Sequence, residues 1–193
     1  MNSEQNSMRT RRLAFLIPLA GFLVLAGFAS LALLATLRGE RDITHLPSAM
    51  VGKPAPAEAL PDLRDAGGTV SAIDFKGHPF LVNVFASWCA PCRAEAPALA
   101  QLSEEIEIFG IAYKDKSEDT RGFLATYGDP FVGIGIDRDG DAGMSWGVYG
   151  VPETFLVDAS GTIILRHAGP IDRRVLDELL RPAIRDLAAG TKP

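Results

Sequence analysis

The chain has 193 residues, of which 47% are apolar and 22% charged, so it is long enough for one ordinary domain and too apolar for a disordered chain. Its net charge of −5 argues against a general nucleic-acid binder, which normally presents a basic surface. Its two cysteines are too few for a disulfide-dense scaffold or a four-thiolate zinc site.

The first feature along the chain is an uncharged apolar run from Leu13 to Leu37. As a helix it would reach about 37 Å, enough to cross a hydrocarbon core of about 30 Å. The apolar cores of cleaved signal peptides are shorter, usually about 7 to 15 residues, although 28–30 and 32–35 offer weak cleavage-like sites. We therefore predict an uncleaved signal-anchor, a transmembrane helix at 13–37, with cleavage as the alternative.

The charges that flank this run predict its orientation. Residues 9–12 include three arginines, whereas Arg38 and Arg41 are accompanied by Glu40 and Asp42. By the positive-inside rule, residues 1–12 form a cytoplasmic tail and the remaining chain lies outside the cytoplasm. Residues 1–41 carry five Arg and two Glu, net +3, so the rest holds 14 basic and 22 acidic residues, net −8. An acidic domain on a basic-ended anchor is not a polybasic membrane-surface binder.

Residues 38–69 are rich in Pro, Gly and Ala. They begin with a tether at 38–51 that leads into the soluble domain, 52–189, which is followed by a short tail at 190–193. Apolar runs of strand length alternate there with helix-like patterns. We expect strands at 70–75, 80–86, 107–113, 131–136, 154–158 and 162–168, and helices at 90–105, 117–127 and 172–189. The last two strands flank Ala159-Ser160-Gly161, which indicates a hairpin. This order predicts an α/β sheet that is partly parallel and ends in an antiparallel pair.

Both cysteines fall in Cys89-Ala90-Pro91-Cys92, between a buried strand and a helix. Unpaired backbone N–H groups and the positive end of the dipole at a helix start favour a thiolate. Proline suits the first turn, where its missing N–H costs little. Such thiols can have strongly lowered pKa values, and only the thiolate attacks a disulfide. The motif therefore predicts a redox pair.

Other uses of two nearby cysteines fit less well. Haem attachment needs His directly after the second cysteine, where Arg93 stands. A metal site lacks partners, because His45, His78 and His167 are scattered along the chain. A purely structural disulfide across two residues closes too small a loop to stabilise much through chain entropy. We expect neither a metal nor another bound cofactor.

The segment Ala86-Ser87-Trp88-Cys89-Ala90-Pro91-Cys92 resembles the active site of thioredoxin-fold proteins. Pro97 matches the proline that kinks their active-site helix, and Val151-Pro152 resembles their cis-proline loop. The resemblance implies a thioredoxin-like fold, in which helices flank a mixed central sheet, and a cis bond at Pro152. It also implies four substrate-contacting residues: Trp88, Pro91, Val151 and Pro152.

The segment 147–158, Gly-Val-Tyr-Gly-Val-Pro-Glu-Thr-Phe-Leu-Val-Asp, is very similar to the cis-proline segment of the CcmG/DsbE family. Segments 93–95, 113–115 and 166–169 also fit that family, and the resemblance runs from about Gly52 to Leu187. It implies a bacterial inner-membrane protein with one span and a periplasmic catalytic domain. The implied function is a reductant in cytochrome c biogenesis, acting on apocytochrome c (Cys-X-X-Cys-His) or a CcmH-like maturation protein. The implied electron source is DsbD or CcdA.

The carboxylates around the cysteines differ from those of thioredoxin. Asn83 stands where thioredoxin carries a buried carboxylate, so proton transfer needs another group. CcmG-like proteins have acidic residues at the positions of Glu95 and Glu153, which implies redox tuning and proton transfer by these two side chains. A nearby carboxylate raises thiol pKa values and can exchange the proton. For Trp146 and Tyr149, packing is the default expectation.

Three other functions stay open at this point. The nearest is a tethered reductase of the TlpA or ResA kind with other targets, and the second is a thiol oxidant. The third is a non-catalytic binding or chaperone module whose disulfide is structural. Reduction potential separates the first two, and substitution of both cysteines separates a catalyst from a binder.

Overall fold

A computed structural model describes residues 18–32, 34 and 49–190, which fall into two compact units. In the first unit, residues 18–32 are helical. The predicted cytoplasmic tail, both ends of the predicted span, most of the tether and the last three residues lie outside the described residues. Within the described part of the chain, no helix combines the length and the apolar character that crossing a bilayer requires.

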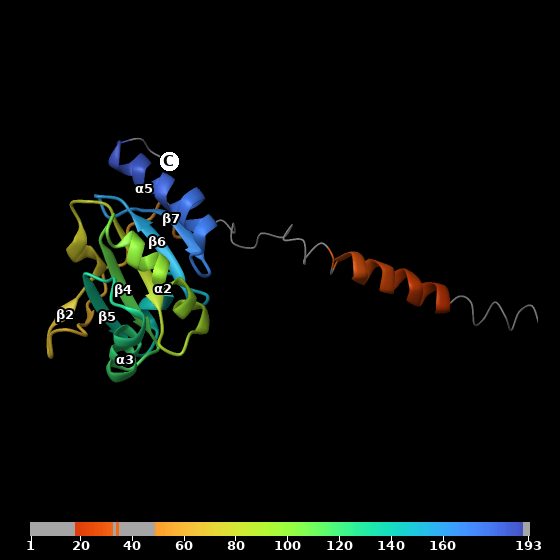
Figure 1. The fold of residues 1–193 in the computed structure, drawn as a ribbon, viewed down its shortest axis with the longest axis horizontal. Helices are drawn as coiled ribbons and strands as arrows, with labels where there is room; N and C mark the ends of the chain where they lie inside the picture. The colour runs from red at the N-terminus through yellow and green to blue at the C-terminus, as the bar shows by residue number, and fades with distance from the viewer. Residues whose placement is uncertain (1–17, 33, 35–48, 191–193) are drawn as a thin grey trace, which may run out of the picture. The chain divides into compact units, whose positions relative to one another are not determined.

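The second unit is built on a five-stranded sheet with the strand order β5-β4-β3-β6-β7 (Figure 1). β3 and β4 pair in parallel, as do β4 and β5, whereas β6 pairs antiparallel with β3 and with β7. The predicted mixed sheet with a terminal antiparallel hairpin is therefore confirmed. The strands are β3 (Phe80–Phe85), β4 (Ile108–Tyr113), β5 (Gly133–Asp137), β6 (Glu153–Val157) and β7 (Ile163–Ala168).

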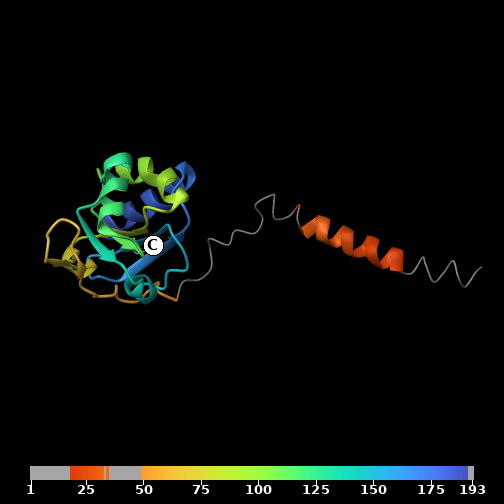
Figure 2. The same ribbon diagram turned by 90° about the horizontal axis from the view of Figure 1, so that it is seen from below.

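Helices cover both faces of the sheet, which explains why all six residues of β3 are buried. One face packs against α2 (Ala90–Leu102), α3 (Ser117–Tyr127) and a C-terminal helix made of the π-helical η3 (Val175–Leu180) and α5 (Arg181–Ala188). These three helices lie together on one side of the sheet in Figure 2. The other face packs against the short helix α4 (Asp141–Ser145) and the segment that enters the domain. Successive side chains of β3 thus point alternately into two separate hydrophobic cores, one on each face of the sheet.

The strand expected at 70–75 is wrong. In this region only Thr69–Val70 form a strand, β2, which pairs with Leu60–Pro61 (β1) in a small two-stranded sheet. Residues Ala72–Phe75 form the 3₁₀ helix η2. The carboxylate of Asp74 accepts the backbone N–H of Ser71 at 2.8 Å, and this local hydrogen bond closes a helical turn.

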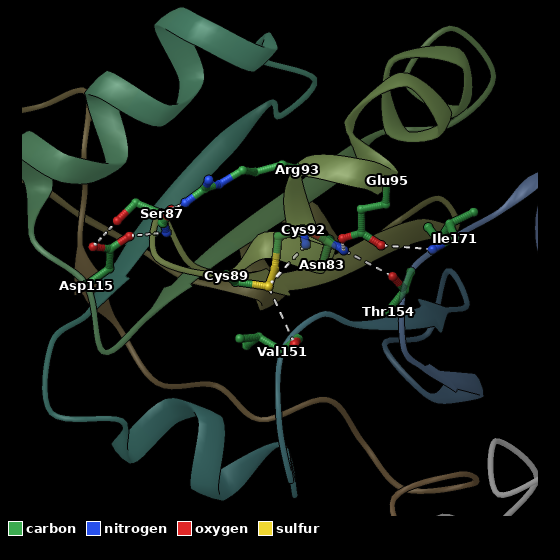
Figure 3. Close-up of a disulfide and its surroundings, with 10 residues drawn as sticks. All are labelled: Asn83, Ser87, Cys89, Cys92, Arg93, Glu95, Asp115, Val151, Thr154 and Ile171. Carbon is green, nitrogen blue, oxygen red and sulfur yellow. Dashed lines mark hydrogen bonds between the residues drawn. A yellow bond between two sulfur atoms is a disulfide. The ribbon is translucent and has the colours of Figure 1, made fainter.

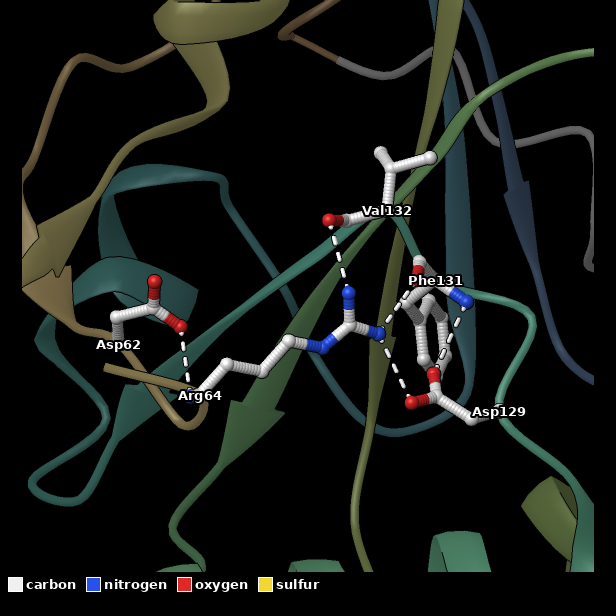
Figure 4. A network of polar contacts seen from close by, with 5 residues as sticks. All are labelled: Asp62, Arg64, Asp129, Phe131 and Val132. Atoms are coloured by element: carbon white, nitrogen blue, oxygen red, sulfur yellow. Dashed lines mark hydrogen bonds and ion pairs between the residues drawn. The ribbon is translucent and has the colours of Figure 1, made fainter. Parts of the chain in front are cut away.

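Arg64 connects this N-terminal part of the domain to the loop before β5 (Figure 4). Its guanidinium donates to the carbonyl oxygens of Phe131 and Val132 at 2.6 and 3.0 Å, and to the carboxylate of Asp129 at 2.8 Å. The two carbonyl contacts hold in place the residues just before β5, an edge strand of the sheet. The small sheet is therefore part of the domain.

The short helix α4 was not among the expected elements. Its cause is Asp137, whose buried carboxylate accepts the N–H groups of Gly140, Ala142 and Gly143 at 2.8 to 3.2 Å. These are donors that a helix start leaves without intrahelical partners. The capping carboxylate thus turns the Gly- and Asp-rich segment into a helix.

Candidate active site

The two cysteines stand where the central strand gives way to the first helix of the domain (Figure 3). Cys89 is the N-cap of α2, and its Sγ accepts the N–H of Cys92 at 3.1 Å. The pair is disulfide-bonded with a Cα–Cα distance of 5.3 Å, and each residue is at most 3% exposed. Pro91 lies in the first turn and is exposed. The predicted placement of the redox pair at a helix start is confirmed.

The loop before β6 faces this disulfide. The Val151–Pro152 peptide bond is cis, and the carbonyl oxygen of Val151 lies 3.5 Å from Cys89 Sγ. Pro152 is buried and Val151 half-buried. The sheet thus brings together two segments that are 62 positions apart, as the resemblance implied.

Trp88 lies next to Cys89 and is 56% exposed, with its indole Nε1 donating to the carbonyl of Lys114 at 3.3 Å. It forms part of an open groove with Arg93 and Tyr127. An exposed aromatic side chain beside a redox pair offers a partner protein an apolar contact with a polar edge.

The preceding residue, Ser87, is held by the buried carboxylate of Asp115. Asp115 accepts the N–H of Ser87 at 2.7 Å, its hydroxyl at 2.8 Å and the hydroxyl of Thr120 at 3.1 Å. This carboxylate was not among the predicted site residues, although it lies in a segment that fits the family. Its hydrogen bonds with Ser87 connect the loop before Cys89 to the loop between β4 and α3.

Glu95 lies one turn after Cys92 and is fully buried. It accepts the side-chain N–H of Asn83 at 3.0 Å and the backbone N–H of Ile171 at 3.1 Å. Burial raises the pKa of Glu95 to about 7, and the two hydrogen bonds oppose that rise without cancelling it. A carboxyl group with that pKa can both accept and release a proton at neutral pH.

A cavity of about 10 Å³ lies between α2, β3 and the end of α3, and its lining includes Cys92, Glu95 and Asn83. That volume is close to the least that holds one water molecule. The Asn83 side-chain N–H₂ also donates to Thr154 Oγ1 at 3.1 Å, whereas its buried Oδ1 has no hydrogen-bond partner among the described residues. Most of the other lining residues are apolar, and Glu95 and Cys92 lie around this one shared space.

Glu153 is also buried, but it lies on the opposite face of the sheet, because side chains alternate along β6 and Thr154 points toward Asn83. Its carboxylate accepts Arg166 Nε at 2.7 Å and the N–H groups of Tyr149 and Gly150 at 2.8 and 3.3 Å. Glu153 is absent from the lining of the cavity that holds Cys92. Its hydrogen bonds instead hold the loop that leads into the cis-proline.

The two aromatic residues of that loop differ. Trp146 is 1% exposed and packs edge-on against Phe155 at 5.0 Å, so its expected role in packing is confirmed. Tyr149 is 85% exposed, and the guanidinium of Arg166 lies 4.8 Å from its ring centre. Arg166 therefore contacts both Glu153 and Tyr149 at the edge of the site.

A Cys-X-X-Cys pair at a helix start, opposite a cis-proline on a mixed sheet, defines a thioredoxin-like thiol:disulfide oxidoreductase. The Redoxin family model matches residues 50–180. The thiol:disulfide interchange protein DsbE of Allochromatium vinosum is 40% identical, over 95% of this chain and 99% of the relative. HelX of Rhodobacter capsulatus, also a thiol:disulfide interchange protein, is 42% identical over 88% and 93%.

A solved structure agrees with these relatives. The thioredoxin domain of a thiol-disulfide oxidoreductase from Bacteroides vulgatus is 26% identical, with a TM-score of 0.61 over 72% of this chain and 99% of that domain. The chain belongs to the Redoxin family and, within it, to the CcmG/DsbE family of thiol:disulfide interchange proteins.

Proposed function

We propose that this thiol:disulfide oxidoreductase is a membrane-anchored periplasmic reductant of cytochrome c biogenesis. The observation that carries the proposal is the buried Cys89–Cys92 pair, which faces the cis-Pro152 loop and lies beside the exposed Trp88. The substrates are disulfides of apocytochrome c or of a CcmH-like maturation protein. The reaction uses no bound cofactor or metal.

The chemistry begins with both cysteines reduced. The Cys89 thiolate attacks one sulfur of the partner disulfide, so that a mixed disulfide forms and the other partner sulfur leaves as a thiolate and takes a proton. Cys92 then loses its proton, and its thiolate attacks Cys89 Sγ. This step forms the Cys89–Cys92 disulfide and releases the second partner sulfur as a thiolate, which takes a proton, so the dithiol has passed two electrons to the partner.

Glu95 is the proton acceptor for Cys92 in this scheme. It lines the same cavity as Cys92, and its pKa of about 7 leaves a large ionised fraction at neutral pH. Cys89 needs no such base, because the start of α2 stabilises its thiolate through the N–H of Cys92. The two thiols are therefore activated by different groups.

The chain must be reduced again after each cycle. Because the periplasm is oxidising, the electrons come from a membrane dithiol protein of the DsbD or CcdA kind. That donor's thiolate attacks the Cys89–Cys92 disulfide, and the donor is left oxidised.

The uncharged run at 13–37 supports the anchor. Over residues 18–32 of this run, apolar side chains are exposed around the helix, including Phe22 at 67%, Leu25 at 71% and Phe28 at 76%. A helix that is apolar all round needs an apolar environment. The anchor predicts that the full-length chain stays in the membrane pellet after an alkaline carbonate wash, whereas a cleaved chain would be shorter and extractable.

The function is tested by trapping partners. In Cys92→Ser, the first attack still occurs but resolution does not, so mixed disulfides accumulate in membranes and can be identified by mass spectrometry. The matched control is the double variant Cys89→Ser, Cys92→Ser, which should trap nothing and fail to support cytochrome c maturation. Capture of apocytochrome c or a maturation protein supports the proposal.

Other outcomes point elsewhere. Capture of many unrelated proteins without any cytochrome-maturation component would indicate a broader tethered reductase. Support of cytochrome maturation by the double variant would indicate a binding module. A reduction potential as oxidising as about −120 mV would indicate a thiol oxidant.

A further inference from the structure

Three buried polar residues lie side by side across the sheet, on the face that packs against α2. In the strand register Asn83 is opposite Thr154, and Thr154 is opposite His167 on β7. Directly opposite residues on one face have Cβ atoms about 5 Å apart. Each of the three is at most 5% exposed. The row therefore extends from the Glu95 contact on β3 to the edge strand of the sheet.

A single peptide group joins the far end of this row to Glu95. His167 Nε2 lies 3.4 Å from the carbonyl oxygen of Pro170, and the N–H of Ile171, which donates to Glu95 Oε2 at 3.1 Å, belongs to the same peptide bond. Because a carbonyl oxygen only accepts, this contact requires the ring tautomer in which His167 Nε2 carries the hydrogen. The imidazole N–H, the peptide and the carboxyl group then form one continuous chain of hydrogen bonds.

We infer that His167 is a positioning residue that sets the ionisation of Glu95 through the Pro170–Ile171 peptide. Hydrogen bonds in a chain polarise one another, so donation to the carbonyl makes the N–H of Ile171 a stronger donor. A stronger donor favours the carboxylate over the carboxylic acid. The inference rests on the proposed function only where it assigns proton transfer to Glu95. The coupling of His167 to the pKa of Glu95 is a property of the folded protein and does not depend on that assignment.

The other titratable groups around Glu95 do not replace this route. Cys92 on α2 shares its cavity, while α3 and the loop between α3 and β5 contribute no ionisable side chain to the lining. Asp172, next to Ile171, has its carboxylate accepting the N–H of Val175 at the start of the C-terminal helix. The Glu153–Arg166 ion pair lies on the other face of the sheet. Among these groups, His167 is therefore the ionisable side chain that contacts the Pro170–Ile171 peptide, whose N–H donates to Glu95.

The test is a pH titration of Glu95 in the full-length, oxidised chain in detergent micelles. Carboxyl ¹³C NMR monitors the titration, and the Glu95 signal is assigned as the one that Glu95→Gln lacks. No turnover is needed, so the result does not depend on the proposed function. His167→Leu removes the donor and should raise the Glu95 titration midpoint by about one pH unit. His167→Gln keeps an N–H at a similar position and should restore most of the wild-type midpoint. His78→Leu removes an exposed imidazole that pairs with Glu107, and should change nothing.

The same shift should move the pH profile of disulfide reduction, measured with reduced enzyme and insulin, toward higher pH in His167→Leu. Loss of a merely structural contact would lower the rate without moving the profile. An unchanged Glu95 midpoint in folded His167→Leu overturns the inference, as does an equal rise in His167→Gln. If His167→Leu does not fold, the ring ¹⁵N chemical shifts of His167 in the wild type test the inference. A His167 Nε2 without a hydrogen overturns the inference, and a protonated Nε2 supports it.

Discussion

Glu95 and Glu153, two buried glutamates that sequence places near the redox pair, lie on opposite faces of the central sheet and have different partners. Glu95 is bound by Asn83 and Ile171 and shares a cavity with Cys92. Glu153 forms an ion pair with Arg166. Glu95 therefore lies beside Cys92, whereas Glu153 accepts hydrogen bonds from the loop that leads into the cis-proline.

The first prediction concerns pH and stability. The folded-state pKa of Glu95, about 7, lies above its unfolded value of 4.5, so between these values the native state keeps a proton that the unfolded state has released. The contribution of Glu95 to the free energy of unfolding is therefore fully present below pH 4.5. It is lost as the pH rises from 4.5 through 7, by about 3 kcal/mol in total. Urea unfolding of the oxidised protein between pH 4 and 8 should show this decline and should show much less of it in Glu95→Gln. An equal decline in both proteins would assign it to other groups.

The second prediction concerns Asn83, whose hydrogen bond lowers the pKa of Glu95. Asn83→Leu removes the donor, so the Glu95 midpoint should rise further, by about one pH unit. Asn83→Asp places a second carboxyl against Glu95, and two adjacent carboxyls hold one proton strongly. Carboxyl ¹³C NMR should then show two coupled transitions, one of them well above pH 7. A single unshifted transition in Asn83→Asp contradicts the contact.

The third prediction concerns the Glu153–Arg166 pair, in which both side chains are at most 8% exposed. Removing one partner leaves a buried charge unpaired, so Glu153→Gln and Arg166→Met should each lose about 3 kcal/mol of unfolding free energy. The double variant should lose clearly less than the sum of the two. Urea unfolding of the four proteins in a double-mutant cycle measures the coupling. Additive losses would mean that the pair does not act as a unit.

The parts of the fold predicted from sequence are those with local causes. β3 is a continuous apolar run because it is covered on both faces, and Cys89 follows it at a helix start that needs an N-cap. The C-terminal helix has the expected extent within one or two residues, although six of its residues are π-helical. Resemblance added the cis bond at Pro152, which local pattern alone does not indicate.

The parts that were missed depend on contacts between distant segments. Glu95 meets Ile171 across 76 positions, and Ser87 meets Asp115 across 28. Neither contact leaves a periodic signal in the sequence. Glu153 was expected near the dithiol because it follows Pro152, but strand alternation turns its side chain to the other face. Proximity in sequence to a motif therefore did not identify which carboxylate shares the cavity with Cys92.

The fourth prediction concerns Asp115, which accepts two hydrogen bonds from Ser87. Asp115→Asn replaces a charged acceptor by a weaker one and turns one oxygen into a donor, so the unfolding free energy should fall by about 2 kcal/mol. The amide of Ser87 should also exchange faster with deuterium, because its strongest acceptor is lost. Asp119→Asn, an exposed carboxylate on the neighbouring helix α3, is the matched control. Unchanged exchange at Ser87 would show that Asp115 does not hold this loop.

The last prediction concerns Trp88, which is exposed and adjoins Cys89. Trp88→Ala removes little buried surface, so the unfolding free energy should change by no more than about 0.5 kcal/mol. Aromatic side chains at the centre of a protein interface often contribute about 2 kcal/mol or more to binding. Reaction with a protein disulfide such as insulin should therefore slow by about tenfold or more, whereas reaction with a small disulfide such as oxidised glutathione should change much less. Met144→Ala, which changes an apolar residue on α4 that is 73% exposed, should affect neither reaction. Equal slowing with both substrates would assign Trp88 to the chemistry of the thiols and not to partner recognition.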